Sequence, residues 1–283
     1  MKHFFLLFSL VLSCSALEAA PLWMRYPSIS PDGKSIAFTY KGDIYTVPSE
    51  GGKAQRLTTD PAHDFAPVWS PDSSKIAFAS DRYGNFDVYL VDAQGGAPQR
   101  LTTHSGAEIP YCFTNDGRNI LFGASIADPA SSMLHPHSSM KELYSVSING
   151  GRPEQILAVP AERVSFSHSG TLLLYQDKKG GENEWRKHHQ SSITRDIWLY
   201  DTVKNRHTRL TSFAGEDRDP RFSPDDGYIY YLSERSSTFN VWRFALNNKQ
   251  QAPEQVTNFK THPVRFLSIA NNGTLCYGYN GNI

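Results

Sequence analysis

The stretch ISPDGKSIAF (residues 29–38) decides the fold, because the chain repeats it as WSPDSSKIAF at residues 69–78. Alignment on this turn reveals four further copies, which read FTNDGRNILF, FSHSGTLLLY, FSPDDGYIYY and IANNGTLCY. The six copies follow one another at intervals of 40 to 56 residues. Periods in this range are typical of propeller blades and similar repeat arrays.

Two further motifs come after each of the first five copies. One is an aromatic run, which reads GDIYTV, FDVYLV, KELYSV, RDIWLY and FNVWRF. The other reads QRLT, QRLT, EQIL, TRLT and EQVT. With the runs before and after the turn, each unit therefore carries four segments that resemble strands. A four-stranded antiparallel sheet buries its faces by stacking against neighbouring sheets around an axis.

The turn chemistry supports this pattern of strands. Proline suits the first central position of a type I turn, aspartate suits the second, and glycine tolerates the left-handed residue that closes the hairpin. Four copies place a glycine there, at Gly33, Gly117, Gly170 and Gly273. Gly227 comes one place later, so we expect the fifth turn to differ by one residue.

The sequence thus predicts an all-β protein, a β-propeller of four-stranded antiparallel blades. Five complete blades and the start of a sixth are visible. A sandwich of two Greek keys is the competing architecture, but it does not explain one turn repeated at regular spacing. The chain breaks off at YNGNI, where the first blade continues from YKGDI into a third strand. An incomplete blade would expose a long edge, so we expect residues 21–283 to be part of a longer protein.

The first 20 residues have the order of a signal peptide, with Lys2 followed by the apolar run Phe4–Leu12 and then small residues. Cleavage after Ala16, Ala19 or Ala20 fits this order, and Cys14 offers an alternative lipoprotein site. We therefore expect an exported protein, periplasmic or secreted, with no membrane span in the mature chain. The cysteines beyond the leader, Cys112 and Cys276, suit buried thiols, although an exported protein also permits a disulfide.

Composition and motifs narrow the function. The chain has 28 basic and 28 acidic residues, and this balance argues against nucleic-acid binding. It contains no G-x-S-x-G elbow, phosphate loop or H-E-x-x-H motif, so no catalytic residue is predicted. Several histidines occur in loops, including a pair of neighbours, but their spacing is not that of a zinc site. Neither a metal nor a cofactor is expected. The loop histidines considered are His63, His104, His135, His137, His188, His189 and His262.

Two loops between the second and third strands of a blade are expanded, at residues 123–141 and 176–195. Strand order places both on one face of the ring. The second is rich in cationic and aromatic side chains, which suit a carboxylate or a peptide backbone. A solvated loop whose tryptophan packs on the blade is the alternative. The candidate substrate-binding residues are Trp185, Arg186, His188, His189 and Arg195, with Lys187 beside them.

A second cluster of charge is repeated. Asp81 and Arg82 in blade two correspond to Glu234 and Arg235 in blade five. Carboxylates in SDRYGNFDVY (residues 80–89) would also suit a cation. A repeated pair is more typical of a structural clamp within the blade than of a site, and we predict a clamp.

SPDGKSIAF, GDIYTV and QRLT resemble the propeller repeats of the tricorn protease and of the translocation protein TolB. NEWRKHHQSSITRDIWLYD (183–201) and GEDRDPRFSPDDGYIYYLSERSSTFNVW (215–242) resemble the N-terminal propeller of tricorn-like bacterial serine peptidases. The resemblance covers everything after the leader. It implies a PDZ module and a protease core in the same parent chain, with the propeller guiding or filtering peptides. No part of that core matches these residues.

Two other functions remain open on sequence. One is a stand-alone binding propeller like TolB, which would dock envelope proteins. The other is the propeller cap of a peptidase of the prolyl-oligopeptidase type. The natural chain beyond residue 283 discriminates among the three: a PDZ module and core, nothing, or an α/β-hydrolase domain.

Overall fold

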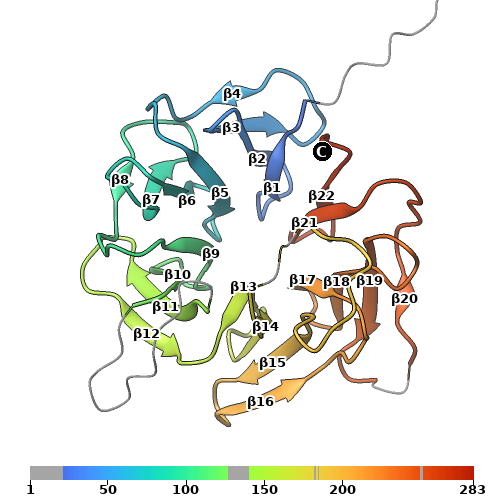
Figure 1. The fold of residues 1–283 in the computed structure, drawn as a ribbon. Helices are drawn as coiled ribbons and strands as arrows, with labels where there is room; N and C mark the ends of the chain where they lie inside the picture. Colours follow the sequence, from blue (N-terminus) through green and yellow to red (C-terminus); the bar gives the residue numbers. More distant parts are fainter. Residues whose placement is uncertain (1–21, 127–139, 182, 184, 249–250) are drawn as a thin grey trace, which may run out of the picture.

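The protein is a ring of small antiparallel sheets around a central axis (Figure 1). The structure is a computed structural model that describes residues 22–126, 140–181, 183, 185–248 and 251–283. The described residues contain strands and turns but no helix. The leader, His135 and His137 lie outside the described residues.

Five blades have four strands each, and the sixth has two. The first three blades contain β1 (Arg25–Ile29), β2 (Ser35–Tyr40), β3 (Asp43–Pro48), β4 (Gln55–Arg56), β5 (Asp64–Trp69), β6 (Lys75–Ser80), β7 (Asp87–Asp92), β8 (Gln99–Arg100), β9 (Ile109–Phe113), β10 (Asn119–Ala124), β11 (Glu142–Ser147) and β12 (Glu154–Leu157). The others contain β13 (Ala161–Phe166), β14 (Leu172–Asp177), β15 (Ile197–Asp201), β16 (Arg206–Arg209), β17 (Asp217–Phe222), β18 (Tyr228–Ser233), β19 (Asn240–Ala245), β20 (Glu254–Gln255), β21 (Val264–Ile269) and β22 (Leu275–Tyr279).

In every blade the strands pair in chain order from the axis outward (Figure 1). The innermost strands β1, β5, β9, β13, β17 and β21 surround the axis, and a repeated turn joins each to the second strand. The predicted propeller, with five complete blades and the start of a sixth, is therefore confirmed. A sandwich is excluded because the sheets form separate blades. We call the face with the repeated turns the turn face and the opposite face the insertion face.

The S-P-D-G turn is held by its own side chains. In the second copy the Ser70 hydroxyl donates to the Asp72 carboxylate at 2.6 Å, and the Ser70 hydroxyl oxygen also accepts the N–H of Lys75 at 2.9 Å. Hydrogen bonds to Asp72, led by the one from Ser70, lower its pKa because they favour the ionised carboxylate. The fifth turn corrects our expectation: it has the ordinary length, and Asp226 itself is left-handed with φ 55°. Aspartate tolerates this conformation better than most residues, so the later Gly227 is not required.

The aromatic run and the R-L-T motif are parts of one clamp. In blade one, Arg56 pairs with Asp43 at 2.8 Å, and the Thr58 hydroxyl accepts the N–H of Ile44 at 3.0 Å. Blades two and four repeat it through Arg100 with Asp87 and Arg209 with Asp196, each at 2.8 Å. The clamp fixes the short outer strand of a blade to the start of the third strand.

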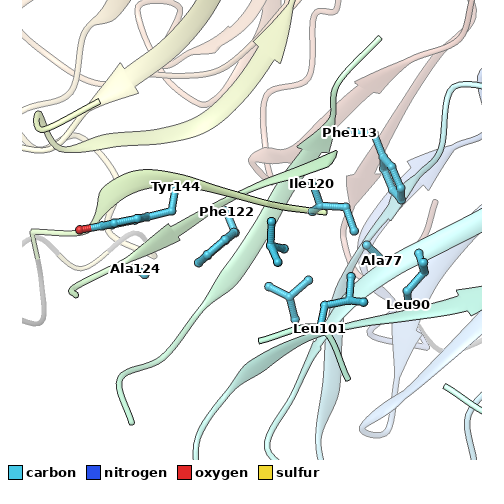
Figure 2. Packing of buried hydrophobic residues seen from close by; sticks show 10 residues of the cluster. Ala77, Leu90, Leu101, Phe113, Ile120, Phe122, Ala124 and Tyr144 are labelled. Carbon is cyan, nitrogen blue, oxygen red and sulfur yellow. The ribbon is translucent and has the colours of Figure 1, made fainter. Parts of the chain in front are cut away.

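Apolar clusters lie between successive blades. The largest joins β6, β7 and Leu101, which follows β8, to β9, β10 and β11, and Figure 2 shows Ala77 and Leu90 facing Phe113 and Ile120. Equivalent clusters fill the other junctions, so each blade buries its faces against its neighbours. The junction between blades six and one has the smallest cluster, with Ile29, Ala270 and Cys276 buried. Both Cys112 and Cys276 are free thiols.

Candidate functional site

The central channel is shaped by a bulge that recurs in the innermost strands. Pairing with the second strand shifts by one residue in each of the six. The position that we call the turn serine is held by Ser30, Ser70, Ser167 and Ser223, and by Thr114 and Ala270 in blades three and six. The fourth residue before it is left-handed in five blades, at Tyr26, Ala66, Arg163, Asp219 and Phe266. Blade three has Pro110 there, and proline cannot adopt positive φ. We call these six residues the bulge ring, and all of them line a small void of about 50 Å³ inside the channel.

Two residues further along each strand lies a second set of channel-lining side chains, which we call the turn-side ring. Its members are Ser28, Val68, Cys112, Ser165, Arg221 and Ser268, and each lines a cavity within the channel. On the other side of the bulge, the fifth residue before the turn serine gives the insertion-side ring. It consists of Arg25, Phe65, Ile109, Glu162, Arg218 and Arg265. Cationic side chains therefore outnumber acidic ones along the channel.

The insertion end of the channel is filled by aromatic and arginine side chains. Tyr26 packs against Phe266 with ring centroids 4.4 Å apart and against Phe65 at 5.4 Å. Trp185 of the blade-four insertion meets Phe266 at 6.0 Å, and the guanidinium groups of Arg25 and Arg265 lie 5.1 and 4.9 Å from its ring centre. Such cation–π contacts hold an indole over cationic strands. We call Tyr26, Phe65, Trp185 and Phe266 the aromatic plug.

The insertion reaches the plug by crossing from blade four to blades five, six and one. The N–H of His188 donates to the Glu234 carboxylate of blade five at 2.6 Å. The carbonyl of Trp185 accepts from Arg265 of blade six at 3.3 Å. The indole thus packs across the channel mouth rather than on its own blade, although 43% of its surface remains exposed.

The predicted binding residues fall into two environments. Trp185, Arg186 and His188 are exposed on the insertion face, and His189 is half-buried with Nε2 2.8 Å from the Ser191 hydroxyl. Arg195 is only 3% exposed and lies between Glu162 at 3.7 Å and Glu216 at 3.6 Å. It belongs to the base of the insertion and does not join the other four at the surface.

Buried ion pairs set the charge state around Arg195. Burial by itself raises the pKa of Glu162, but Lys178 and Arg195 outweigh it, so the net pKa is lowered. Burial also opposes ionisation of Glu216, and the hydrogen bond from Arg218 at 2.9 Å leads the effects that lower its pKa. The carboxylates are therefore ionised and need their cations.

The arginines of the two repeated pairs, Arg82 and Arg235, form a loop clamp as predicted, but each pairs with the first residue of its blade's innermost strand and not with the neighbouring acid. Arg82 pairs with buried Asp64 at 2.8 Å, and Arg235 pairs with buried Asp217 at 3.0 Å. Among the loop histidines that the structure describes, Nδ1 of His104 has a local role and accepts the N–H of Gly106 at 3.0 Å. No cluster suited to a metal ion occurs in the described part of the chain. Nor does any helix there reach the length and apolarity of a membrane span.

Sequence reasoning missed the arginines of the innermost strands. Arg25, Arg163, Arg218, Arg221 and Arg265 are scattered along the chain, but each lies two to five residues before a turn serine or its counterpart. The distance back to the turn was the available signal, and it is five residues for Arg25, Arg218 and Arg265, four for Arg163 and two for Arg221. Since the same offset places a residue at the same height in every blade, it predicts which side chains meet in the channel.

A family model described as the tricorn protease N-terminal β-propeller domain matches residues 21–283. The chain belongs to this family. This tricorn-type propeller is 39% identical over 66 residues, 23% of its length, to tricorn protease homolog 1 of Streptomyces coelicolor. It is 28% identical over 253 residues, 73% of its length, to dipeptidyl-peptidase 5 of Porphyromonas gingivalis.

Solved structures agree on the fold. The tricorn-type propeller superposes on a crystal structure of the tricorn protease with a TM-score of 0.76 over 92% of its length, at 18% identity. A putative TolB from Agrobacterium tumefaciens gives 0.65 over 83%, at 17% identity. The propeller spans 6% of the Streptomyces protein, 36% of the Porphyromonas enzyme, 25% of the tricorn chain and 80% of the TolB chain.

Proposed function

We propose that this propeller is a non-catalytic domain that guides or filters peptide substrates for a serine-peptidase core in the same polypeptide. Membership of the tricorn N-terminal propeller family carries the proposal. Two of the relatives described above are also named as proteases or peptidases. A PDZ module beside that core belongs to the same proposal.

The chemistry of the insertion face supports a role with peptides. Arg25, Arg186 and Lys187 are exposed around the aromatic plug. Peptides carry a terminal carboxylate that guanidinium and ammonium groups bind by charge-assisted hydrogen bonds. Their apolar side chains pack on exposed aromatic rings such as the indole of Trp185. A bound peptide would therefore be held at the mouth that the plug closes.

The test is the binding of fluorescently labelled peptides with a free C-terminus and of the same peptides amidated at that end. We expect Trp185→Ala and the double variant Arg186→Ala/Lys187→Ala each to weaken binding by roughly tenfold at low salt. Lys53→Ala, which removes an exposed cation from the β3–β4 hairpin, is the matched control. Wild-type affinity in both insertion variants, with unchanged thermal unfolding, would contradict the proposal.

A stand-alone protein-binding propeller is the second candidate. It is favoured by the match to the TolB structure, because that match covers most of both chains. The two candidates differ in their ligand: one binds extended peptides, and the other binds a folded partner. Titration with an unfolded protein segment and with its folded parent discriminates them, since only a docking propeller prefers the folded form.

Export is also a proposal, based on the order of residues 1–20. We infer that this leader directs the protein out of the cytoplasm and is removed. Sequencing the N-terminus of the mature protein from a periplasmic fraction tests this. A start at Leu17, Ala20 or Pro21 supports a signal peptidase site, a lipidated Cys14 supports an anchor, and an intact leader contradicts export.

A further inference from the structure

The turn face carries a cavity at the end of the channel opposite to the insertion. Its volume is about 420 Å³, much larger than the voids at the bulge ring and beneath Trp185. The turn residues of the blades form its rim, and the residues before the turn serines form an apolar wall. Wall residues include Trp69, Phe113, Phe166, Phe222 and Ile269.

Arg221 lies at the floor of this cavity. It is the one charged residue of the turn-side ring, whose other members are serines, a valine and a cysteine. Its Nη1 donates to the carbonyl oxygens of Pro220 at 2.8 Å and Arg163 at 3.1 Å. Arg221 also lines the deeper void, so its guanidinium separates the cavity from the rest of the channel.

The guanidinium of Arg221 forms no ion pair with any described residue. Asp219, two residues earlier on the same strand, pairs with Arg163 at 3.5 Å instead. By contrast, Arg218 has a carboxylate oxygen of Glu216 at 2.9 Å, and Arg235 has one of Asp217 at 3.0 Å. Arg221 is half-buried, and this partial loss of water lowers its pKa, although the nearby Asp219 carboxylate acts in the opposite direction. A cation in this state is stabilised by any anion that reaches it.

We propose that the turn-face cavity binds a carboxylate-bearing ligand with an apolar body, whose carboxylate pairs with Arg221. The apolar body lies against the wall, where Phe166 and Phe222 flank the floor. The rim favours a single negative charge over two, because it carries the Asp226 carboxylate, which accepts the N–H of His168 at 2.9 Å. This site does not depend on the proposed function, since it shares no residue with the insertion.

The carboxylate has two possible sources, a free organic acid or the C-terminus of a short peptide. Isothermal titration with 3-phenylpropionate, 3-phenylpropionamide, N-acetyl-Ala-Phe, its C-terminal amide and inorganic phosphate separates them. We expect the wild-type protein to bind one or both carboxylates and neither amide, with phosphate weaker. Tighter binding of the peptide acid identifies a chain end, and tighter binding of 3-phenylpropionate identifies a small acid.

Variants assign the binding to the arginine. Arg221→Gln should weaken carboxylate binding by roughly tenfold or more, because a charge-assisted bond is lost. Arg221→Lys keeps the charge and should retain part of the affinity, while Lys53→Gln should bind as the wild type does. The proposal is overturned if no carboxylate binds the wild type, if the amides bind equally well, or if folded Arg221→Gln protein keeps full affinity.

Discussion

The two ends of the channel are built on the same repeated strands, yet they treat charge in opposite ways. At the insertion end, Arg195 and Arg218 have carboxylate partners, and Arg25 and Arg265 lie against Trp185. At the turn end, the hydrogen bonds of Arg221 with described residues go to backbone carbonyls, and its side chain faces an open cavity. The comparison teaches that the fold sets where a side chain lies, while neighbours from other blades decide whether its charge is satisfied.

The largest effect is expected at the satisfied end. Arg195→Met removes the cation between half-buried Glu162 and buried Glu216. These carboxylates keep Lys178 and Arg218 as partners, so we place the cost at about 2–3 kcal/mol, below the roughly 3–5 kcal/mol of a fully stranded buried charge. We expect denaturant unfolding to show a loss of this size at neutral pH. The matched change at the other end, Arg221→Met, should alter the free energy of unfolding by at most about 1 kcal/mol, because it strands no carboxylate. Equal losses in both variants would end the distinction between the two arginines.

The insertion end should also be the more sensitive to pH. Glu108, fully buried just before β9, has its pKa raised to about 7 by burial. In the unfolded chain this carboxyl loses its proton near its ordinary pKa of 4.5. Because the folded protein holds the proton up to a higher pH, the stabilisation from the protonated carboxyl is complete below pH 4.5 and is lost as the pH rises to about 7. The loss is at most about 1.4 kcal/mol per pH unit.

Glu108→Gln removes this titration. We expect the variant to be more stable than the wild type at pH 8 and to lose that advantage towards pH 5. Unfolding curves across this range measure the difference. Parallel pH profiles for the two proteins would show that the carboxyl is not held protonated in the fold.

The smallest effects are expected in the turns that rim the turn face. Gly33 has φ +75°, and a Cβ there would lie 2.8 Å from Nδ2 of Asn272. Gly33→Ala should therefore destabilise the protein by about 1–2 kcal/mol. Ser73 occupies the same position in blade two with φ 61°, so Ser73→Gly relieves this conformation. Because it also removes the hydroxyl that accepts the N–H of Asp32 at 3.2 Å, the gain in stability should be at most roughly 0.5 kcal/mol. Thermal unfolding measures both, and shifts of the same sign would contradict the equivalence of the two turns.

The repeat predicted the architecture well because each motif is local. S-P-D-G is held by bonds within five residues, and the aromatic run and R-L-T close one clamp inside a blade. The site was harder to predict because its contacts join different blades. Arg186 and Arg195 look alike on one loop, but Arg186 is exposed, whereas Arg195 is buried between a carboxylate from β13 and one from the residue before β17. The sequence next to Arg221 offers two acidic residues, Asp217 and Asp219, and it does not indicate that both pair with other arginines.

The turn-side ring also bears on how such a protein changes over generations. Each of its six members projects from a bulged strand into the channel, and only Val68 and Cys112 also pack against an apolar cluster between blades. Of the other four, Ser165 and Ser268 bridge neighbouring blades, because the Ser165 hydroxyl donates to the carbonyl of Pro220 and the Ser268 hydroxyl accepts the N–H of Ile29, each at 3.1 Å. A point substitution at Ser28 or Arg221 is therefore the one expected to change what the channel recognises while the blades keep their contacts. At the opposite mouth, by contrast, Trp185 of the aromatic plug comes from the blade-four insertion and not from a strand. Specificity on the turn face is therefore open to evolution, and to engineering, one residue at a time.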